Sequence, residues 1–318
     1  MDPRHLVQLS VILEKGSITQ ASRHLHLTQP TLTHNMQILE MQAGGVLFER
    51  SRFGVRSTAL GEMLAREGRN IAQTLQSAAE VSARYLGGLQ NQLRLGIGPL
   101  VGAAILPDLA AALFTQHPSV ALTVQSDRPQ ALLEQLIDKR HDFVVAPSWL
   151  ERAPRGIERT ALIEDELAIF CGNTHPWVVT AQRAGTARYH DELEWLSLGT
   201  ASPFDQNVRA MLNAIGIGTT RTRMTFLGDA QLLLGMLSRG HYLAVLPRFP
   251  TRILANRFQL VEINVDAPAS PRNIHLWHRS ELLEDPTLSS LQAAIVECAR
   301  DLQRNAPHVP SVTVSQVG

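Results

Sequence analysis

The chain has 318 residues, of which 44% are hydrophobic and 18% are charged; this length predicts two or three domains, and this composition allows a sizeable core. Its 29 basic residues balance 29 acidic residues, which excludes a generally basic nucleic-acid coat protein. The two cysteines, Cys171 and Cys298, lie far apart in the sequence, and we expect both to be buried thiols rather than parts of a redox switch.

The start of the chain has the pattern of an amphipathic helix. Leu6, Leu9 and Leu13 recur at helical spacing, which predicts a helix over residues 3–15 with one apolar face. Gly16 follows directly and can end that helix in a left-handed backbone conformation, which glycine adopts without steric strain.

Two further helices are predicted over residues 17–40. Ser17 and Gln20 have the spacing of a capping box, in which the two side chains satisfy backbone N–H groups at the start of a helix. After a tight turn, Thr28 can cap the third helix, and Pro30 lies in its first turn, where a missing N–H does no harm. Two short helices joined in this way form a helix-turn-helix. The later of the two, which is the third helix of the chain, can enter a DNA groove.

The third helix divides into an apolar face and an uncharged polar face. Leu32, Met36 and Leu39 step by four and three, and we expect them to pack inward. Glutamine, threonine and histidine on the other side can donate to and accept from base edges in a major groove. An ordinary three-helix core with a polar surface fits this feature about equally well. The candidate DNA-contacting residues of this helix are Gln29, Pro30, Thr31, Thr33, His34 and Gln37.

Over about the first 65 residues, the sequence resembles the winged helix-turn-helix of LysR-type transcriptional regulators. The matching pieces are Gly16-Ser17-Ile18-Thr19, Thr28-Gln29-Pro30, Leu47-Phe48-Glu49-Arg50 and Ser57-Thr58-Ala59-Leu60-Gly61. The departures from the family pattern are Leu9 for phenylalanine, Ser22 for alanine, Thr33 for serine, and Gln42-Ala43-Gly44-Gly45 at the start of the wing. Leu9 is still a core residue, and Thr33 keeps the hydroxyl of serine. The unusual start of the wing leaves the register of the wing hairpin open.

The resemblance implies a DNA-binding domain over residues 1–58, in which residues 47–58 form a hairpin wing. It places Arg50, Arg52 and Arg56 close to the phosphates or the minor groove, although a solvated charged loop is the alternative for each. Residues 1–57 hold six basic and four acidic residues, a net charge of +2. One copy is therefore expected to bind DNA weakly at physiological salt, so that useful affinity needs two or more copies on one site.

Residues 59–88 are predicted to form a long helix, since the segment contains no proline and ends at Gly87-Gly88. Seven of its residues alternate steps of four and three, the heptad spacing of a coiled-coil seam. In the resembled family this helix is the linker that dimerises the chain, whereas packing on its own domain is the alternative. The seam residues are Leu64, Gly68, Ile71, Leu75, Ala78, Ser82 and Tyr85.

Beyond the two glycines, predicted strands alternate with predicted helices, which favours a parallel sheet with helices on its faces. Two such units follow, lobe I over residues 92–163 and 268–304 and lobe II over residues 164–267. Paired lobes of this kind bind small ligands in the cleft between them. In the resembled family the α/β lobes are similar to type 2 periplasmic binding proteins and sense an effector. Residues 305–318 are expected to be a disordered tail.

The residues at the predicted strand ends are candidates for the effector site. Hydroxyl and backbone N–H groups at helix starts suit an organic anion such as a carboxylate, and Arg128 could add a bidentate clamp. The leucine, valine and phenylalanine in the set favour a partly apolar or aromatic acid, while a capping or packing role explains each residue about equally well. The candidates are Pro99, Leu100, Val101, Ser126, Asp127, Arg128, Ser202, Phe204, Phe226 and Pro247.

One motif favours a dinucleotide-binding enzyme instead. Gly96, Gly98 and Gly102 lie between a predicted strand and a predicted helix, and Asp127 follows the next strand. However, the third glycine is one residue late, and Pro99 removes an N–H group from the loop that would hold the pyrophosphate. The acid lies 29 residues beyond Gly98 instead of about 20. A nicotinamide-dependent dehydrogenase is therefore disfavoured.

We predict a bacterial, homodimeric or homotetrameric LysR-type regulator that is not an enzyme and has no catalytic residue, metal or cofactor. Its expected partners are double-stranded operator DNA and a small-molecule effector, with RNA polymerase as a further candidate. The sequence shows no run near the roughly 18 apolar residues of a membrane span and no apolar signal peptide, so a cytoplasmic location without membrane contact is expected. The competing hypothesis is a ligand-binding enzyme or receptor that carries a helical head.

Overall fold

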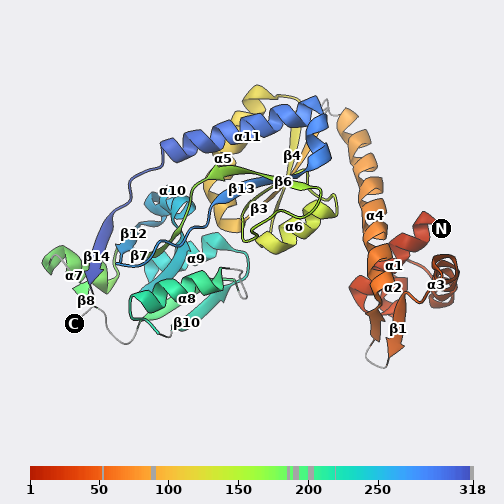
Figure 1. The fold of residues 1–318 in the computed structure, drawn as a ribbon, viewed down its shortest axis with the longest axis horizontal. Helices are drawn as coiled ribbons and strands as arrows, with labels where there is room; N and C mark the ends of the chain where they lie inside the picture. Colours follow the sequence, from red (N-terminus) through yellow and green to blue (C-terminus); the bar gives the residue numbers. More distant parts are fainter. Residues whose placement is uncertain are drawn as a thin grey trace. The chain divides into compact units, whose positions relative to one another are not determined.

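The computed structural model describes the whole chain except residues 52–53, 87–90, 185–186, 189–192, 200–203, 219 and 316–318. Its tertiary contacts divide the chain into two compact units. The first unit holds residues 1–90 together with residues 138–140, and the second holds the rest (Figure 1). Each unit is built around its own buried apolar clusters.

The first unit is a three-helix core with a hairpin and a long helix. Its elements are α1 (Pro3–Lys15), α2 (Ile18–His24), α3 (Gln29–Ala43), β1 (Phe48–Ser51), β2 (Gly54–Ser57) and α4 (Ala59–Leu86). Leu9 and Ile12 from α1 and Leu32 and Met36 from α3 are completely buried together. The helix-turn-helix and the strand pairing of the wing are therefore confirmed, because the apolar spacing of each helix finds a common core.

The turn after α1 also positions the wing. The Ser17 hydroxyl accepts a hydrogen bond from the N–H of Gln20, as the capping pattern predicts. Gly16 ends α1 with a φ of 62°, and its carbonyl oxygen accepts from the N–H of Val55 at 2.9 Å. A Cβ atom on Gly54 would lie 2.5 Å from that same oxygen. The left-handed turn thus ties β2 directly to the helix-turn-helix.

The long helix α4 packs on this core backbone to backbone. A Cβ atom on Gly61 would lie 1.8 Å from the carbonyl oxygen of Leu47, and one on Gly68 would lie 2.0 Å from that of Leu6. Only glycine permits so close an approach, because any side chain would overlap the neighbouring main chain. The two glycines therefore determine where α4 lies against α1 and the start of the wing.

This contact corrects part of the predicted coiled-coil seam. Leu64 and Ile71 pack against the apolar cluster of the first unit, and Gly68 between them meets α1. That half of the seam covers the core of its own domain, because a three-helix core left open on one side buries the nearest apolar stripe. Leu75, the next seam residue, is 65% exposed, so the exposed part of the seam begins at this residue.

The second unit consists of two lobes, each built on a mixed sheet. The sheet of lobe I has the strand order β4-β3-β5-β13-β6, and that of lobe II has the order β10-β9-β11-β7-β12-β14-β8. The elements of lobe I are β3 (Asn91–Ile97), α5 (Pro99–Gln116), β4 (Val120–Ser126), α6 (Pro129–Ile137), β5 (Phe143–Pro147), β6 (Ile157–Ile163), β13 (Ile274–Arg279), the 3-10 helix η1 (Ser280–Glu284) and α11 (Pro286–Arg304). Those of lobe II are β7 (Leu167–Gly172), α7 (Pro176–Ala184), β8 (Ala187–Arg188), β9 (Glu194–Leu198), α8 (Asp205–Ala214), β10 (Arg221–Phe226), α9 (Ala230–Arg239), β11 (Tyr242–Pro247), α10 (Arg248–Phe258), β12 (Leu260–Asn264) and β14 (Ser311–Ser315).

The predicted parallel sheet is found only in part. Helix-connected strands do pair in parallel, as β3 does with β4 and β5. In contrast, β7 runs antiparallel to β11 and β12, and β13 runs antiparallel to β5 and β6. These two are the first strands after the chain crosses into lobe II and back into lobe I. A crossing without a helix brings the chain in from the opposite direction, since parallel pairing needs a long crossover.

The helix α5 corrects a second expectation. Its 18 residues contain one charged residue, Asp108, and by length and composition alone the helix could cross a membrane. It packs instead against α9, α10 and α11 inside the second unit, where Leu109 and Leu113 are buried. An apolar run of this length is therefore used as the central helix of a protein core.

The predicted disordered tail is also wrong as far as residue 315. The strand β14 pairs in parallel with β12 and with β8, at the edge of the lobe II sheet (Figure 1). Val309 and Val314 are 2% and 3% exposed. The alternation of Val312 and Val314 supplies an apolar strand face, which an open sheet edge can bury. Because α11 packs on lobe I, residues 305–310 make a third connection between the lobes.

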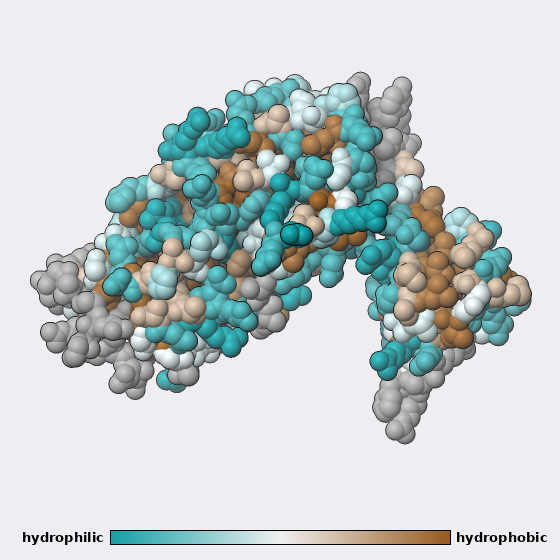
Figure 2. Space-filling view, viewed as in Figure 1, coloured by the Kyte–Doolittle hydropathy of each residue, from teal (hydrophilic) through white to brown (hydrophobic). Residues whose placement is uncertain are grey.

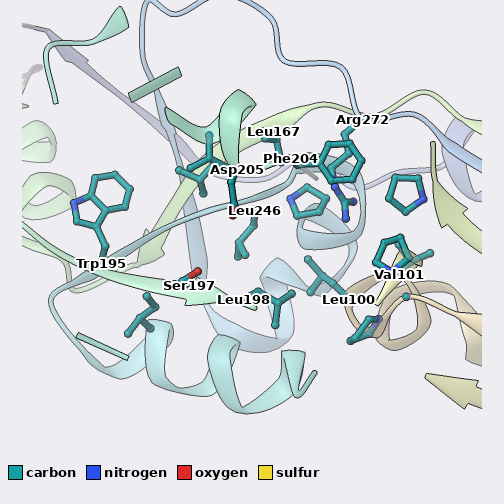
Figure 3. A pocket seen from close by; sticks show the side chains of 18 of the residues that line it. Leu100, Val101, Leu167, Trp195, Ser197, Leu198, Phe204, Asp205, Leu246 and Arg272 are labelled. Atoms are coloured by element: carbon teal, nitrogen blue, oxygen red, sulfur yellow. The ribbon is translucent and has the colours of Figure 1, made fainter. Parts of the chain in front are cut away.

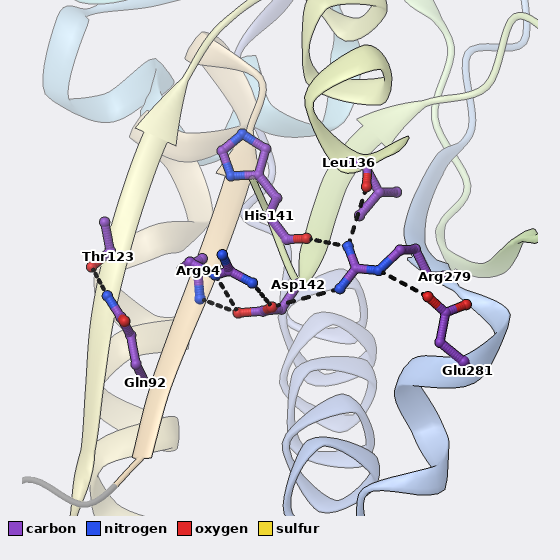
Figure 4. A network of polar contacts seen from close by, with 8 residues as sticks. All are labelled: Gln92, Arg94, Thr123, Leu136, His141, Asp142, Arg279 and Glu281. Carbon is purple, nitrogen blue, oxygen red and sulfur yellow. Dashed lines mark hydrogen bonds and ion pairs between the residues drawn. The ribbon is translucent and has the colours of Figure 1, made fainter. Parts of the chain in front are cut away.

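A buried ion-pair network holds the start of lobe I together (Figure 4). The Asp142 carboxylate accepts hydrogen bonds from the backbone N–H of Arg94 at 2.8 Å and from its guanidinium at 2.6 Å and 3.1 Å. It also lies 3.8 Å from the guanidinium of Arg279, which donates to the carbonyl oxygens of Leu136 and His141. Burial lowers the pKa of Arg279, while Asp142 raises it. The network thereby joins β3, α6, β5 and β13.

Asp165 joins two segments by which the chain crosses between the lobes. Its N–H donates to the side-chain oxygen of Asn273 at 3.0 Å, and its carbonyl oxygen accepts from the N–H of Arg272 at 2.7 Å. Its carboxylate accepts from the N–H of Phe249 at 2.7 Å. Burial raises the pKa of this carboxyl to about 6, although the Phe249 N–H and the charges of Arg272 and Arg248 lower it. These crossing segments, which form the hinge between the lobes, therefore contain a buried acid whose hydrogen-bonding capacity is only partly used.

Replacing Gly68 with alanine is expected to destabilise the first unit by about 1–3 kcal/mol, because the new methyl group overlaps the main chain of α1. Gly235→Ala in α9 is the matched control, since a Cβ atom there meets nothing within 4 Å. That variant should be neutral or more stable by about 0.5–1 kcal/mol, because alanine favours a helix. Calorimetric unfolding of the full chain measures both. Equal losses would show that the close approach is not the cause.

The Asp165→Asn variant is expected to change how stability depends on pH. A folded-state pKa near 6, above the ordinary value of 3.8, means that the protonated carboxyl is favoured by folding. This contribution is complete below pH 3.8 and is lost as the pH rises through 6. The free energy of unfolding of the wild type relative to the variant should therefore fall between those pH values, by about 3 kcal/mol at most.

Urea unfolding from pH 4 to 8 measures that difference. The comparison with the variant is essential, because burial lowers the pKa of His175 to about 4 and gives both proteins an opposite slope over the same range. A difference between the two proteins that does not vary with pH would contradict the assignment to Asp165.

Candidate functional sites

The polar face of α3 lies on the surface of the first unit, opposite its buried face. Thr33 is half-buried, and the other five candidates of this helix are exposed: Gln29, Pro30, Thr31, His34 and Gln37. Leu32, Met36 and Leu39 are completely buried on the other side. The two-faced division of this helix predicted from the sequence is therefore confirmed.

Side-chain hydrogen bonds orient the start of α3. The Thr28 hydroxyl accepts from the N–H of Thr31 at 3.3 Å and lies 2.7 Å from the Thr31 hydroxyl. The Thr19 hydroxyl, on α2, donates to the side-chain oxygen of Gln29 at 3.4 Å. The amide of Gln29 is thus held by one end, with its N–H₂ group left to donate outward. Such an amide can pair with the edge of an adenine.

The structure also resolves the wing register that the sequence left open. Glu49 pairs with Arg56, and Arg50 pairs with Val55. Arg56 is exposed, but the carboxylate of Glu49 lies directly across the ladder and reduces the positive charge of that face. Arg52 lies outside the described residues. Glu49 therefore reduces the positive charge that Arg56 can offer to phosphates.

A cavity with a volume of about 170 Å³ lies between the two lobes of the second unit. Side chains from the start of α5 face others from β9, α8 and β11 across this space (Figure 3). Most of the wall is apolar, as with Trp195, Leu198 and Leu246. Its charged residues, among those described, are Asp205 and Arg272. The cavity has the apolar lining and the few polar groups that are typical of a small-molecule site.

Half of the effector residues predicted from the sequence line this cavity. They are Pro99, Leu100, Val101, Phe204 and Pro247. Phe226 is half-buried at the end of β10 and is absent from the described wall, and Ser202 lies outside the described residues. The start of α5 was predictable because a helix that follows a sheet strand must begin at the ligand edge of the sheet.

The candidates at the end of β4 lie elsewhere. Ser126 faces a separate hollow beside α5. The carboxylate of Asp127 accepts hydrogen bonds from the N–H of Arg128 and from the side chain of Gln135, so it serves the start of α6. Arg128 itself is exposed, and the following residue, Pro129, lines the cavity in its place. Because β4 is the edge strand of its sheet, its end is open to solvent.

The cation of the cavity is Arg272, which sequence reasoning missed. Its guanidinium carbon lies 4.7 Å from the centre of the Phe204 ring, and the group points inward beside that ring (Figure 3). Its Nη1 atom is buried without a hydrogen-bond partner among the described residues. Burial lowers the pKa of Arg272 to about 10, opposed by the charge of Asp165, so the group stays charged at neutral pH. No local pattern marks this arginine, because only the crossing between lobes brings it to the cleft.

Both cysteines are free, as expected of buried thiols. Cys171 is completely buried in β7, and burial raises its pKa to about 12. Burial, together with Asp108 and Asp301, also raises the pKa of the half-buried Cys298. Both groups therefore stay protonated at neutral pH, whereas the thiolate is the reactive form.

Comparison with known proteins accounts for both parts of the chain. The family model described as bacterial regulatory helix-turn-helix protein, lysR family, matches residues 3–62. The model described as LysR substrate binding domain matches residues 86–300. The HTH-type transcriptional regulator EstR of Acinetobacter baylyi is 31% identical over 172 residues, which are 54% of this chain and 56% of that regulator. The chain thus spans a little over half the length of that relative.

Longer but weaker similarities cover almost the whole chain. The HTH-type transcriptional regulator YofA of Bacillus velezensis is 23% identical over 284 residues, 89% of this chain and 93% of that protein. The crystal structure of full-length CbnR complexed with its target DNA has the same fold, with a TM-score of 0.60 at 21% identity over 95% of this chain and 100% of that one. The helix-turn-helix model and the substrate-binding model of the LysR family match in this order along one polypeptide. The chain therefore belongs to the LysR family of transcriptional regulators.

Proposed function

We propose that several copies of this regulator bind a pseudo-palindromic operator, and that a small organic anion in the interlobe cavity controls the placement of their recognition helices. The observation that carries the proposal is the presence, in one chain, of an exposed uncharged face on α3 and a cavity lined by a cation whose Nη1 atom is buried. The first feature suits base edges and the second suits a carboxylate.

In this proposal α3 enters the major groove and the wing follows the phosphates. Gln29, Thr33, His34 and Gln37 are the candidate base readers, with Pro30 and Thr31 at the start of the helix and Arg50, Arg52 and Arg56 on the backbone. The hydrogen bond from Thr19 supports a reading role for Gln29, because an amide held at one end is preorganised to donate from the other. The pairing of Arg56 with Glu49 leaves little electrostatic affinity for a single copy.

The need for more than one copy assigns a role to the exposed part of α4. Met63 and Leu75, both on this helix, are 61% and 65% exposed, and hydrophobic residues gather on the visible face of the first unit (Figure 2). A second α4 could cover Leu75 and the helix beyond it, which would make the protein a dimer, and two dimers would form a tetramer. Such an assembly would act in the cytoplasm, where operator DNA and RNA polymerase are available.

The effector would act through the angle between the lobes. A ligand that contacts both walls of the cavity binds most tightly when the lobes are close, and it shifts the population toward that state. The proposed contacts are Pro99, Leu100 and Val101 from lobe I, Phe204 and Pro247 from lobe II, and Arg272 from the crossing segment. The remaining sequence candidates, among them Ser126, Asp127 and Arg128, have less support because they lie outside the described wall.

An enzyme that carries a helical head has less support. The described residues of the cavity include one carboxylate, Asp205, but neither a histidine nor a cysteine that could serve as base or nucleophile. The Ser197 hydroxyl donates to the carbonyl oxygen of Gly199 at 3.1 Å, so it is engaged in the loop. This wall is therefore better suited to hold a ligand than to transform it.

A gel-shift assay with the DNA upstream of the chain's own gene tests the regulator. We expect salt-sensitive, sequence-selective binding by the wild type. Gln29→Ala should reduce the selectivity about tenfold, the effect of losing one good base contact, without changing the salt dependence. Gln42→Ala is the matched control, because Gln42 is an exposed glutamine of the same helix, about 20 Å further along its axis.

The control should behave as the wild type does. Absence of selective binding by the wild type would refute the regulator, whereas an unchanged footprint of Gln29→Ala would show that another face of α3 reads the operator. A loss of selectivity in Gln42→Ala as large as in Gln29→Ala would mean that the substitutions disturb the helix rather than a base contact.

A further inference from the structure

Arg272 is half-buried, and it combines charge with an unmet hydrogen-bonding capacity at a buried atom. Its Nη1 atom has no acceptor among the described residues, although the residue carries a full charge at neutral pH. A buried donor without a partner is costly, and more so when it is charged. The ring of Phe204 covers one side of the guanidinium at 4.7 Å but supplies no acceptor oxygen. The cavity wall therefore offers a planar cation to a bidentate acceptor.

The remainder of the wall defines what that acceptor is attached to. Leu100, Leu198 and Leu246 lie around the centre of the cavity, facing the side to which Arg272 points (Figure 3). The start of α5 carries Pro99 and Leu100, so its first turn presents apolar side chains rather than hydroxyls. A volume of about 170 Å³ is close to the ~150 Å³ cavity that holds a benzene molecule in another protein. A single ring therefore fits.

The charge of the wall limits the ligand to one anionic group. Arg272 is the only cation among the described residues that line the cavity. Asp205, half-buried at the start of α8, lies on the same wall. A second carboxylate on the ligand would be repelled by Asp205 without gaining a cation of its own, which costs binding energy in a low-dielectric site.

Arg272 also connects the ligand to the hinge. Its N–H donates to the carbonyl oxygen of Asp165 at 2.7 Å, which joins the second crossing segment to the first. A carboxylate on the guanidinium would add negative charge near the one acid that acts electrostatically on Arg272. Binding of a carboxylate to Arg272 would therefore change the electrostatic energy of the segments that connect the two lobes, in addition to that of the cavity wall.

We propose that Arg272 is the residue that recognises the effector, and that the effector is a monocarboxylic acid whose apolar body is the size of one ring. This inference rests on the proposed function of the cavity as the effector site. It replaces Arg128, the arginine that the sequence suggested, with one that the crossing segment brings into the cleft.

The test uses the full-length protein and four probes of similar shape: benzoate, benzamide, benzylamine and phthalate. Thermal unfolding and calorimetric titration measure binding. We expect benzoate to bind at least about tenfold more tightly than neutral benzamide, because a charge-assisted bidentate pair is lost in the amide. Benzylamine and phthalate should bind more weakly than benzoate, the first through repulsion by Arg272 and the second through repulsion by Asp205.

Arg272→Met retains an apolar side chain of similar length without the charge, and it should bind benzoate and benzamide equally. Arg272→Lys, which keeps a charge but not the planar fork, should retain part of the preference and serves if the methionine variant does not fold. Arg128→Met is the matched control and should bind all four probes as the wild type does. Gel shifts of each variant without ligand report DNA binding separately.

Three outcomes would overturn the inference: an unchanged benzoate preference in Arg272→Met, the loss of that preference in Arg128→Met, or a wild type that favours another probe or binds none. Failure of the proposed regulator would appear elsewhere, as absent operator binding by the wild type. The titrations would still show, independently of operator binding, whether the cavity prefers benzoate.

Discussion

The architecture of the second unit depends on the repeated crossing of the chain between its lobes. Two of the crossing segments meet where the N–H of Arg272 donates to the carbonyl oxygen of Asp165 at 2.7 Å. Each sheet is completed only after a crossing, so β7 and β13 enter their sheets in the reverse direction. Lobe I needs β13, which follows the second crossing, to complete its sheet, and lobe II receives β14 only after the third. The cavity therefore lies beside the crossing segments, and one of them carries the charged residue Arg272 into its wall.

The same crossing leaves two buried charges incompletely satisfied. The Oδ2 atom of Asp165 and the Nη1 atom of Arg272 both lack hydrogen-bond partners among the described residues. The two groups stabilise one another at a distance, since each shifts the pKa of the other toward its charged form while burial acts in the opposite direction. The Asp142 network in lobe I shows the contrast, because its carboxylate accepts several hydrogen bonds. Asp165 and Arg272 are thus incompletely satisfied where two crossing segments meet, and a ligand or a movement of the lobes can relieve this.

In the first unit, close main-chain contacts hold the DNA-reading elements in one rigid arrangement. Gly61 and Gly68 bring α4 against the start of the wing and against α1, and Gly16 anchors β2. A rotation of α4 would therefore be transmitted to α1 and to the start of the wing. This rigidity suits a regulator in which the distance between two recognition helices is the controlled quantity, because movement would be transmitted rather than absorbed within the unit.

The sequence by itself determined the features that depend on neighbouring residues. The caps at Ser17 and Thr28, the left-handed turn at Gly16 and the two faces of α3 follow from spacing over a few residues, because helix ends and faces are local. The start of α5 at the cavity was predictable for the same reason, since a strand followed by a helix places that turn at the ligand edge.

Only the tertiary structure decided what depends on contacts between distant segments. The stripe from Leu64 to Ile71 has a heptad spacing, but an open core nearby buries it first. Residues 311–315 were expected to be part of a disordered tail, but they pair with β12 as the strand β14. The sequence suggested Arg128, which follows a predicted strand, and gave no signal for Arg272. Spacing shows which residues can share a face, whereas contacts between distant segments decide what that face meets. In this protein the crossing of the chain between the lobes brought Arg272 to the cleft.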